Sequence, residues 1–414
     1  MTVTADHALA AVDFDTYLRM IAAFTDDELI PGEPEMVTSG GVPDEIVQRM
    51  AELGLFGISV PRAYGGLGWT MEQQVLLTFE FTRASCVYRS RFSTVIGLCS
   101  QAILDHGTEE QRREMLPAMA AGRRVTSFAL TEPEAGSDAT NVQTVARRVG
   151  DGWVLDGTKR YITNAHWADT LIVFARTEGS PAEAPEISAF VVDTTLPGVS
   201  TRIPDLMNGH AEGPVAEIDL ESVAVPGDRL LGSTPGTGLA AAMRGINHAR
   251  LHVAATCVGQ ANRMLEETTR HVTERHQFGA PLADLGVVQA ELGRCYAEME
   301  AGRALALDAA RAFDGGTVPR QRISAAKLYC SEMVGRVADR CVQLLGGEGI
   351  VGPHPVPRMW RDVRTLRIYE GASAVHERNL GRAMVRSVAA EGVLPDSYRV
   401  RDASSDEPRG GRTT

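Results

Sequence analysis

Lysine is scarce in this sequence, because Lys159 and Lys327 are the only lysines among 41 basic residues. We interpret this bias as a feature of a GC-rich genome, which carries no information about function. Acidic residues outnumber basic ones by 53 to 41, and the formal charge is −12. An overall basic face for nucleic acid is therefore excluded, although a local arginine cluster still suits a phosphate.

Cysteine pairs are also missing. None of the six cysteines forms a Cys-x-x-Cys pair or has a histidine at zinc-finger spacing, so we expect reduced thiols and no metal site. No uncharged apolar run approaches the ~18 residues of a membrane span, and the first residues lack the basic and apolar regions of a signal peptide. With 44% apolar and 23% charged residues in 414, the sequence predicts a cytoplasmic, globular protein of two or three domains.

The hydrophobic periodicity changes twice along the chain. It is helical from Phe14 to about Gly122, where Thr108 and Gln111 form a predicted capping box. From Val125 the pattern is that of strands, with a hairpin turn at 150–152. The helical period then returns, which favours an α+β fold class. The predicted order is an N-terminal helical domain (13–124), a middle β domain (125–235), a C-terminal helical bundle (236–390) and a flexible tail (391–414).

Two segments of the β region have side chains suited to a flat ring. The first is FALTEPEAGSD at 128–138, which by itself is an ordinary surface turn. The second is RYITN at 160–164, which adds another hydroxyl and an aromatic ring. Thr131 and Thr163 can bond the polar rim of a heteroaromatic ring while Tyr161 covers one face.

Three further motifs lie in the helical region, and each has a plain structural interpretation. ERHQFGAPL at 274–282 is a corner between helices, and QLLGGEG at 343–349 is either a helix cap or a backbone that approaches a pyrophosphate. RDVRTLRIYEG at 361–371 ends in Glu370, and a glutamate before glycine is usually a solvated surface group.

Taken together, in this order and at these separations, the motifs resemble the acyl-CoA dehydrogenase family of FAD-dependent flavoproteins. The resemblance runs from about Asp13 to Arg386. It implies an acyl-CoA dehydrogenase-like fold with an N-terminal helical domain, a middle β-barrel-like domain and a C-terminal four-helix bundle. FAD is expected between the β domain and the bundle.

The resemblance also implies which residues contact FAD. Those expected at the flavin ring and the near phosphate are Phe128, Leu130, Thr131, Ser137, Tyr161 and Thr163. Those expected at the adenosine-diphosphate end of a neighbouring subunit's FAD are Arg275, Gln277, Phe278, Gln343, Gly346 and Gly347. A homo-oligomer follows, typically a tetramer built as two dimers.

Glu370 matches the family's catalytic base. It is expected to remove the α-proton of an acyl thioester while a hydride leaves the β-carbon for flavin N5, which gives a trans-2-enoyl product. Its backbone N–H and a flavin ribityl hydroxyl would hold the thioester oxygen, and burial would raise its pKa. The alternative base position of the family is Ala249, which cannot serve. The expected substrate-side residues are Ser137, Asn247, Arg250, Tyr369 and Gly371.

The chain departs from the family pattern at three places. Ala372 and Ala374 remove two expected FAD hydrogen bonds, and Ser373 is the hydroxyl that could compensate. Asn247 replaces a common aspartate, and the segment 207–220 lacks the usual arginine and hydroxyl residues. These departures concern FAD affinity and acyl specificity.

The favoured function is dehydrogenation of an acyl-CoA, with electrons passed to an electron-transfer flavoprotein. One alternative is the same reaction on an acyl carrier protein thioester in a biosynthetic pathway. Another is a catalytically silent, structural family member. The enzyme is favoured because five site residues are retained together, namely Glu370, Thr131, Ser137, Thr163 and Arg275.

Overall fold

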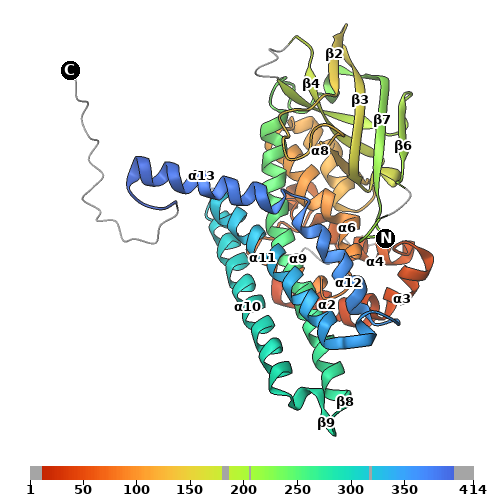
Figure 1. Ribbon diagram of the computed structural model, residues 1–414. Helices are drawn as coiled ribbons and strands as arrows, with labels where there is room; N and C mark the ends of the chain where they lie inside the picture. Colours follow the sequence, from red (N-terminus) through yellow and green to blue (C-terminus); the bar gives the residue numbers. More distant parts are fainter. Residues whose placement is uncertain (1–11, 180–185, 205–206, 317–318, 396–414) are drawn as a thin grey trace, which may run out of the picture.

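The computed structural model describes residues 12–179, 186–204, 207–316 and 319–395. N-terminal helices, a curled β-sheet and a bundle of long helices follow one another along the chain (Figure 1). This order confirms the predicted α+β fold class. The expected tail at 391–414 begins at the last residue of the last helix, and its part from 396 onward lies outside the described residues.

The N-terminal helices enclose an apolar core of their own. The predicted capping box is confirmed, because the Thr108 hydroxyl accepts from the Gln111 N–H while the Gln111 side chain accepts from the Thr108 N–H. The elements are α2 (Phe14–Phe24), the π-helical η1 (Thr25–Leu29), α3 (Ile30–Ser39), α4 (Asp44–Glu52), η2 (Leu55–Gly57), η3 (Arg62–Tyr64), α5 (Met71–Phe81), α6 (Cys86–Thr94), η4 (Val95–Cys99), α7 (Ser100–His106) and α8 (Glu109–Ala120).

The middle of the chain forms one seven-stranded sheet in the order β1-β4-β2-β3-β7-β6, with β5 paired to β4. The predicted hairpin is confirmed, because β2 and β3 are antiparallel and Val149 pairs with Gly152 across the turn. The elements are β1 (Thr126–Ala129), β2 (Val145–Val149), β3 (Gly152–Thr163), η5 (Ala165–Trp167), β4 (Thr170–Thr177), β5 (Ile187–Asp193), β6 (Val199–Arg202), β7 (Val215–Val225) and η6 (Gly227–Arg229).

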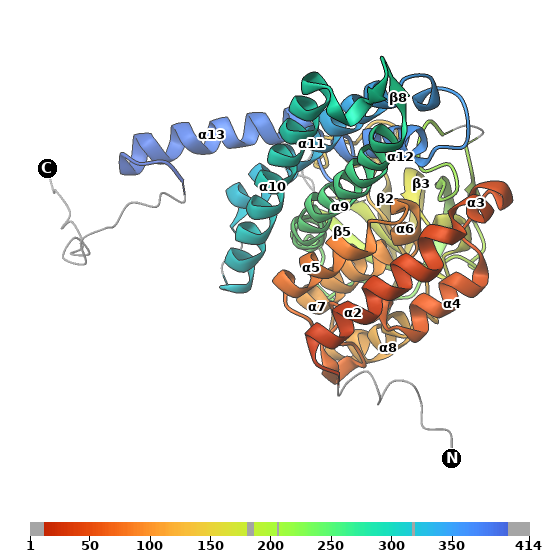
Figure 2. The same ribbon diagram turned by 90° about the horizontal axis from the view of Figure 1, so that it is seen from below.

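Long helices make up the C-terminal part, and the last of them projects from the body (Figures 1 and 2). A two-stranded hairpin joins the first two helices at the tip of the bundle (Figure 1). The elements are α9 (Gly238–Glu274), β8 (His276–Gln277), β9 (Ala280–Pro281), η7 (Leu282–Asp284), α10 (Gly286–Asp314), α11 (Arg320–Leu345), η8 (Gly346–Gly349), α12 (Pro355–Arg364), η9 (Thr365–Arg367) and α13 (Ser373–Glu391).

Helix α9 connects the two helical regions, since it packs against α5 on one side and against α10 and α11 on the other. The approach of α5 is close enough to require glycine at Gly259. A Cβ there would lie 2.2 Å from Thr82 Oγ1 and 2.6 Å from the Phe79 carbonyl oxygen. One face of α9 is therefore fixed within the core, and its residues 247–250 have defined positions.

Among the described residues, no helix is both long and apolar enough to cross a bilayer.

Candidate active site

Glu370 lies in the short segment between η9 and α13, and its backbone is left-handed with φ of 55°. This conformation is uncommon for a residue with a side chain, and it persists only where the surroundings enforce it. Gly371 follows with φ of 99°, and a Cβ on it would lie 2.8 Å from His376 Nε2. The chain thus turns sharply at these two residues, which fixes the direction of the Glu370 side chain.

Hydrogen bonds from three elements hold this turn. Arg250 of α9 donates through Nε to the Glu370 carbonyl oxygen at 3.0 Å, and His376 of α13 donates through Nε2 to the same oxygen at 3.2 Å. Lys327 of α11 donates to the Gly371 carbonyl oxygen at 2.6 Å. Arg250 is itself oriented by Asn247, whose Oδ1 accepts from Nη1 at 2.8 Å. The carboxylate of Glu370 is left without a hydrogen bond to another described residue.

Burial raises the pKa of Glu370 to about 7. Three cations, Arg250, Lys327 and Arg89, oppose this rise but do not cancel it. Burial also lowers the pKa of Lys327 to about 8. A carboxyl group with a pKa near neutrality and no bonded partner is suited to exchange a proton with a bound molecule.

The structure brings most of the expected substrate-side residues together. Asn247, Arg250 and Gly371 belong to the hydrogen-bond network around Glu370. Tyr369 contacts the segment that departs from the family pattern, since its ring lies 6.3 Å from the His210 ring. Ser137 is exposed in the loop after β1, and no contact joins it to this network among the described residues.

The expected flavin-ring residues lie at the ends of two strands. The Arg160 N–H donates to the Thr131 carbonyl oxygen at 2.8 Å, so the loop after β1 runs beside β3. Tyr161 has φ of 59° at an irregularity of β3, and 58% of its surface is exposed. The hydroxyl groups of Thr131, Ser137 and Thr163 make no hydrogen bond to another described residue. Free hydroxyls beside an exposed aromatic ring fit a flat heteroaromatic ligand. Phe128 packs instead on Phe174, and Leu130 is buried.

A buried ion pair supports the loop after β1. Lys159 of β3 is fully buried, and its Nζ lies 2.6 Å from Glu132 Oε1 and 3.2 Å from the Leu130 carbonyl oxygen. Glu132 also accepts hydrogen bonds from the backbone N–H groups of Gln143 and Thr144. Burial lowers the pKa of Lys159 to about 8, and the Glu132 carboxylate opposes this shift. The pair fixes the backbone on both sides of Thr131.

The expected adenosine-diphosphate residues lie at the far end of the bundle from the sheet (Figure 1). His271 near the end of α9 contacts Glu348 of η8 at 3.4 Å, which places the hairpin motif and the glycine motif at one tip. All of these residues are exposed: Arg275, Gln277, Phe278, Gln343, Gly346 and Gly347. Within one chain the structure does not bring them to the flavin-ring residues.

The hydroxyl of Ser373 already donates a hydrogen bond within the chain. It donates to Glu332 Oε1 at 2.6 Å, so its hydrogen does not replace the donors missing at Ala372 and Ala374.

Four residues near Glu370 were absent from the expected site, namely Lys327, His376, His210 and Arg89. The scarcity of lysine was a usable signal for Lys327, because a chain that keeps only two lysines places both in its interior.

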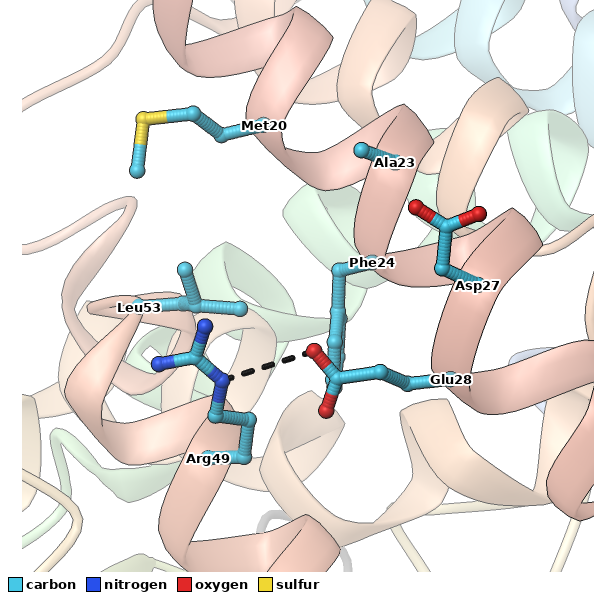
Figure 3. Close-up of a pocket in the computed structure, with 7 residues that line it drawn as sticks. All are labelled: Met20, Ala23, Phe24, Asp27, Glu28, Arg49 and Leu53. Carbon is cyan, nitrogen blue, oxygen red and sulfur yellow. Dashed lines mark ion pairs between the residues drawn. The ribbon is translucent and has the colours of Figure 1, made fainter.

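A surface pocket between α2 and α4 is unrelated to these residues. Its lining residues are Met20, Ala23, Phe24, Asp27, Glu28, Arg49 and Leu53 (Figure 3). Two of its charged groups pair with each other, since Arg49 Nε lies 3.5 Å from Glu28 Oε1. No lining residue comes from the sheet or from the long helices, so the pocket is separate from the Glu370 network.

Comparison with known proteins identifies the family. The acyl-CoA dehydrogenase N-terminal, middle and C-terminal domain models match residues 13–123, 127–223 and 236–385. The chain is 35% identical to a 3-(aryl)acrylate reductase from Clostridium sporogenes, over 87% of this chain and 95% of that protein. It is also 35% identical to caffeyl-CoA reductase-Etf complex subunit CarC from Acetobacterium woodii, over 83% of this chain and 90% of that protein.

Solved structures give the same result. A glutaryl-CoA dehydrogenase from Mycobacterium smegmatis in complex with FADH2 superposes with a TM-score of 0.84 at 29% identity, covering 95% of this chain and 97% of that chain. Butyryl-CoA dehydrogenase from Megasphaera elsdenii superposes with a TM-score of 0.86 at 29% identity, covering 91% and 99%. The chain therefore belongs to the acyl-CoA dehydrogenase family, and it is a flavin-dependent oxidoreductase whose cofactor is FAD.

Proposed function

We propose that this enzyme removes two hydrogens from the α- and β-carbons of an acyl-CoA and produces the trans-2-enoyl thioester, with Glu370 as the base. The observation that carries the proposal is the free carboxylate of Glu370, which is held by a left-handed backbone and has a pKa raised to about 7 by burial. The α-proton of a thioester is weakly acidic, so its removal requires a positioned base whose pKa is near the working pH.

The backbone of the same residue has a second role in the proposal. The N–H of Glu370 makes no hydrogen bond to another described residue, while its carbonyl oxygen accepts from Arg250 and His376. That N–H is therefore available to the thioester oxygen, on which negative charge develops as the α-proton leaves. Thr131, Ser137, Tyr161 and Thr163 would hold the flavin ring, which, when bound, supplies the acceptor for the β-hydrogen as hydride.

The proposed electron acceptor is an electron-transfer flavoprotein. One relative is named as a subunit of a reductase–Etf complex, which supports such a partner. Three relatives are named as reductases or reductase subunits, and a reductase uses the same α- and β-carbons in the opposite direction. We propose the direction of dehydrogenation because other similar proteins are named as glutaryl-CoA and butyryl-CoA dehydrogenases, and a carboxyl group with a pKa of about 7 can accept the α-proton at neutral pH.

Anaerobic mixing with thioesters tests the proposal. The FAD-loaded protein is expected to lose its visible flavin absorbance when a panel of saturated acyl-CoA and acyl carrier protein thioesters is added, and to release the enoyl product. Electron-transfer flavoprotein should restore the colour. Bleaching by none of the saturated thioesters would contradict the proposal. Reoxidation of dithionite-reduced enzyme by enoyl-CoA, together with no bleaching by any saturated thioester, would identify a reductase.

We also propose that the bundle tip binds the adenosine-diphosphate end of a neighbouring subunit's FAD in a homotetramer. Phe278 at this tip is 92% exposed, which is unusual for a large aromatic side chain without a partner. Arg275 beside it can donate two hydrogen bonds to a pyrophosphate.

Arg275→Ala is therefore expected to lose FAD and to weaken the oligomer together. FAD content and sedimentation velocity measure the two effects. The matched control is Arg294→Ala, which removes an exposed arginine of α10 that pairs with Glu291 on its own helix. A wild-type protein that is monomeric at micromolar concentration while fully loaded with FAD would refute the shared site.

A further inference from the structure

A single carboxylate of α11 contacts both ends of the segment that contains Glu370. Glu332 Oε1 accepts a hydrogen bond from Ser373 Oγ at 2.6 Å, and Glu332 Oε2 lies 3.2 Å from Arg367 Nε. Arg367 is the last residue of η9, and Ser373 is the first residue of α13. Glu332 therefore holds the residues that stand three positions before and three positions after Glu370.

The contact with Ser373 fixes the start of α13. Ser373 is the only one of residues 371–375 with a polar side chain. Ala372 occupies the N-cap position, and α13 has no side-chain hydrogen bond to cap it there. The first turn of a helix favours a nearby negative charge, because its N–H groups have no partners within the helix. The Glu332 carboxylate brings that charge to the first residue of α13, so a neighbouring helix holds this helix end.

The contact with Arg367 has a site of its own on α11. The guanidinium also donates to the carbonyl oxygens of Ser331 at 3.4 Å and Glu332 at 3.3 Å. A Cβ at Gly335 would lie 2.1 Å from Arg367 Nη2, so the absence of a side chain at that position makes room for the guanidinium. Glycine is unfavourable inside a helix. Its presence in the middle of α11 is explained by this contact.

The segment between the two contacts has an unfavourable backbone conformation. Glu370 and Gly371 both have positive φ, and for a residue with a side chain this costs free energy unless the surroundings enforce it. The hydrogen bonds described above hold the two carbonyl oxygens of this turn. They act in the middle of the segment, whereas the Glu332 carboxylate acts at its two ends.

We propose that Glu332 is a positioning residue for the reaction, because it holds both ends of this segment and so fixes the direction of the Glu370 carboxylate. The inference rests on the proposed function. A misplacement of about 1 Å at a reacting group can cost about 10²-fold in rate. The side chains of Arg367 and Glu332 are 27% and 33% exposed, and such ion pairs add little to overall stability. The loss of Glu332 should therefore appear in the rate and not in folding.

Stopped-flow reduction of the flavin tests the inference. In Glu332→Ala, the limiting rate with a good saturated thioester should fall by at least about tenfold, while KM stays within about threefold of wild type. Rates are compared on fully FAD-loaded enzyme, so that loss of cofactor does not contribute. Glu300→Ala is the matched control, since Glu300 is 34% exposed and pairs with Arg303 on its own helix. A Glu332→Ala enzyme that is reduced at the wild-type rate would overturn the inference.

Variants of the two contacts assign the effect to them. Ser373→Ala should slow flavin reduction, whereas Ser373→Thr keeps the hydroxyl and should react within about threefold of wild type. Gly335→Ala displaces the Arg367 guanidinium and should also slow the reaction. Because the Ser373 hydroxyl bonds the Glu332 carboxylate, adding Ser373→Ala to Glu332→Ala should cause no further loss. Fully additive losses would show that the two side chains act separately, and would overturn the inference.

Amide hydrogen exchange provides a readout that does not depend on turnover. In Glu332→Ala, the amides of residues 367–376 should exchange at least about tenfold faster than in wild type. Those of α9 should be unchanged, and the Tm should fall by less than about 3 °C. Faster exchange throughout the chain with a large loss of Tm would show that Glu332 is structural, and would overturn the inference. Absence of bleaching of the wild-type enzyme by every saturated thioester would count against the proposed function instead, and the exchange comparison would still decide whether Glu332 holds the segment.

Discussion

Glu370→Gln is expected to slow flavin reduction by a good thioester substrate by about 10²–10⁴-fold, which is the usual contribution of a positioned general base. Glutamine keeps the shape of the side chain and removes its affinity for a proton, so folding and FAD content should be preserved. Stopped-flow bleaching of the flavin measures the rate. Glu377→Gln, an exposed position on α13, is the control and should change the rate by less than about twofold. A Glu370→Gln enzyme that is reduced at the wild-type rate would remove Glu370 from the mechanism.

The pH dependence of the same reaction identifies the titrating group. The wild-type rate should rise with pH through an inflection at about 7, because only the ionised carboxylate accepts the α-proton. The inflection should be absent in Glu370→Gln. Lys327→Met should move it to higher pH, since the charge of Lys327 lowers the pKa of Glu370. An inflection that persists in Glu370→Gln would assign it to another group.

The stability of the folded protein should also depend on the ionisation of Glu370. The pKa of Glu370 in the folded protein lies above its ordinary value of 4.5, so its contribution to stability is complete below that value and is lost as the pH rises through about 7. Glutamine cannot ionise and avoids this loss. The Tm of Glu370→Gln minus the Tm of wild type should therefore increase as the pH rises from about 5 to about 8.

Local signals in the sequence predicted the fold class and the motifs around the site. The capping box of Thr108 and Gln111 and the hairpin at 150–152 depend on residues close together in the chain, so spacing alone indicates them. Local sequence patterns do not predict the network around Glu370. Arg250 and Glu370 are 120 positions apart, and only the approach of α9 to the segment between η9 and α13 brings them into contact. The resemblance to a family supplied that pairing, not the spacing.

Arg89 and the two lysines were not predicted, and the reason differs between them. An arginine in a chain rich in arginine gives no signal, and whether it has a partner is a property of the folded core. The lysines did give a signal. Their scarcity was interpreted as a bias of the genome, yet Lys159 and Lys327 are both buried and both bond the backbone beside site residues. A long, flexible cation that is retained in an interior has a specific acceptor there.

Lys159→Met should have the largest effect on stability. Its loss leaves the carboxylate of Glu132 in the interior without its cation, and breaking a buried pair in this way typically costs about 3–5 kcal/mol. The loop after β1 should loosen, and FAD should be lost with it, because Thr131 directly precedes Glu132. Thermal unfolding and FAD content measure both effects.

A double variant separates the lost pairing from the lost side-chain volume. Glu132→Gln combined with Lys159→Met removes both charges, while the glutamine oxygen can still accept from one of the two backbone N–H groups, those of Gln143 and Thr144, that donate to the two carboxylate oxygens of Glu132. Because a buried pair replaced by neutral groups is often close to neutral for stability, the double variant should regain much of the Tm that Lys159→Met loses. FAD binding should return in parallel. If Lys159→Met alone kept the wild-type Tm and a full complement of FAD, the ion pair would have no part in positioning the loop, and the orientation of Thr131 would depend on the β1–β3 contact through Arg160.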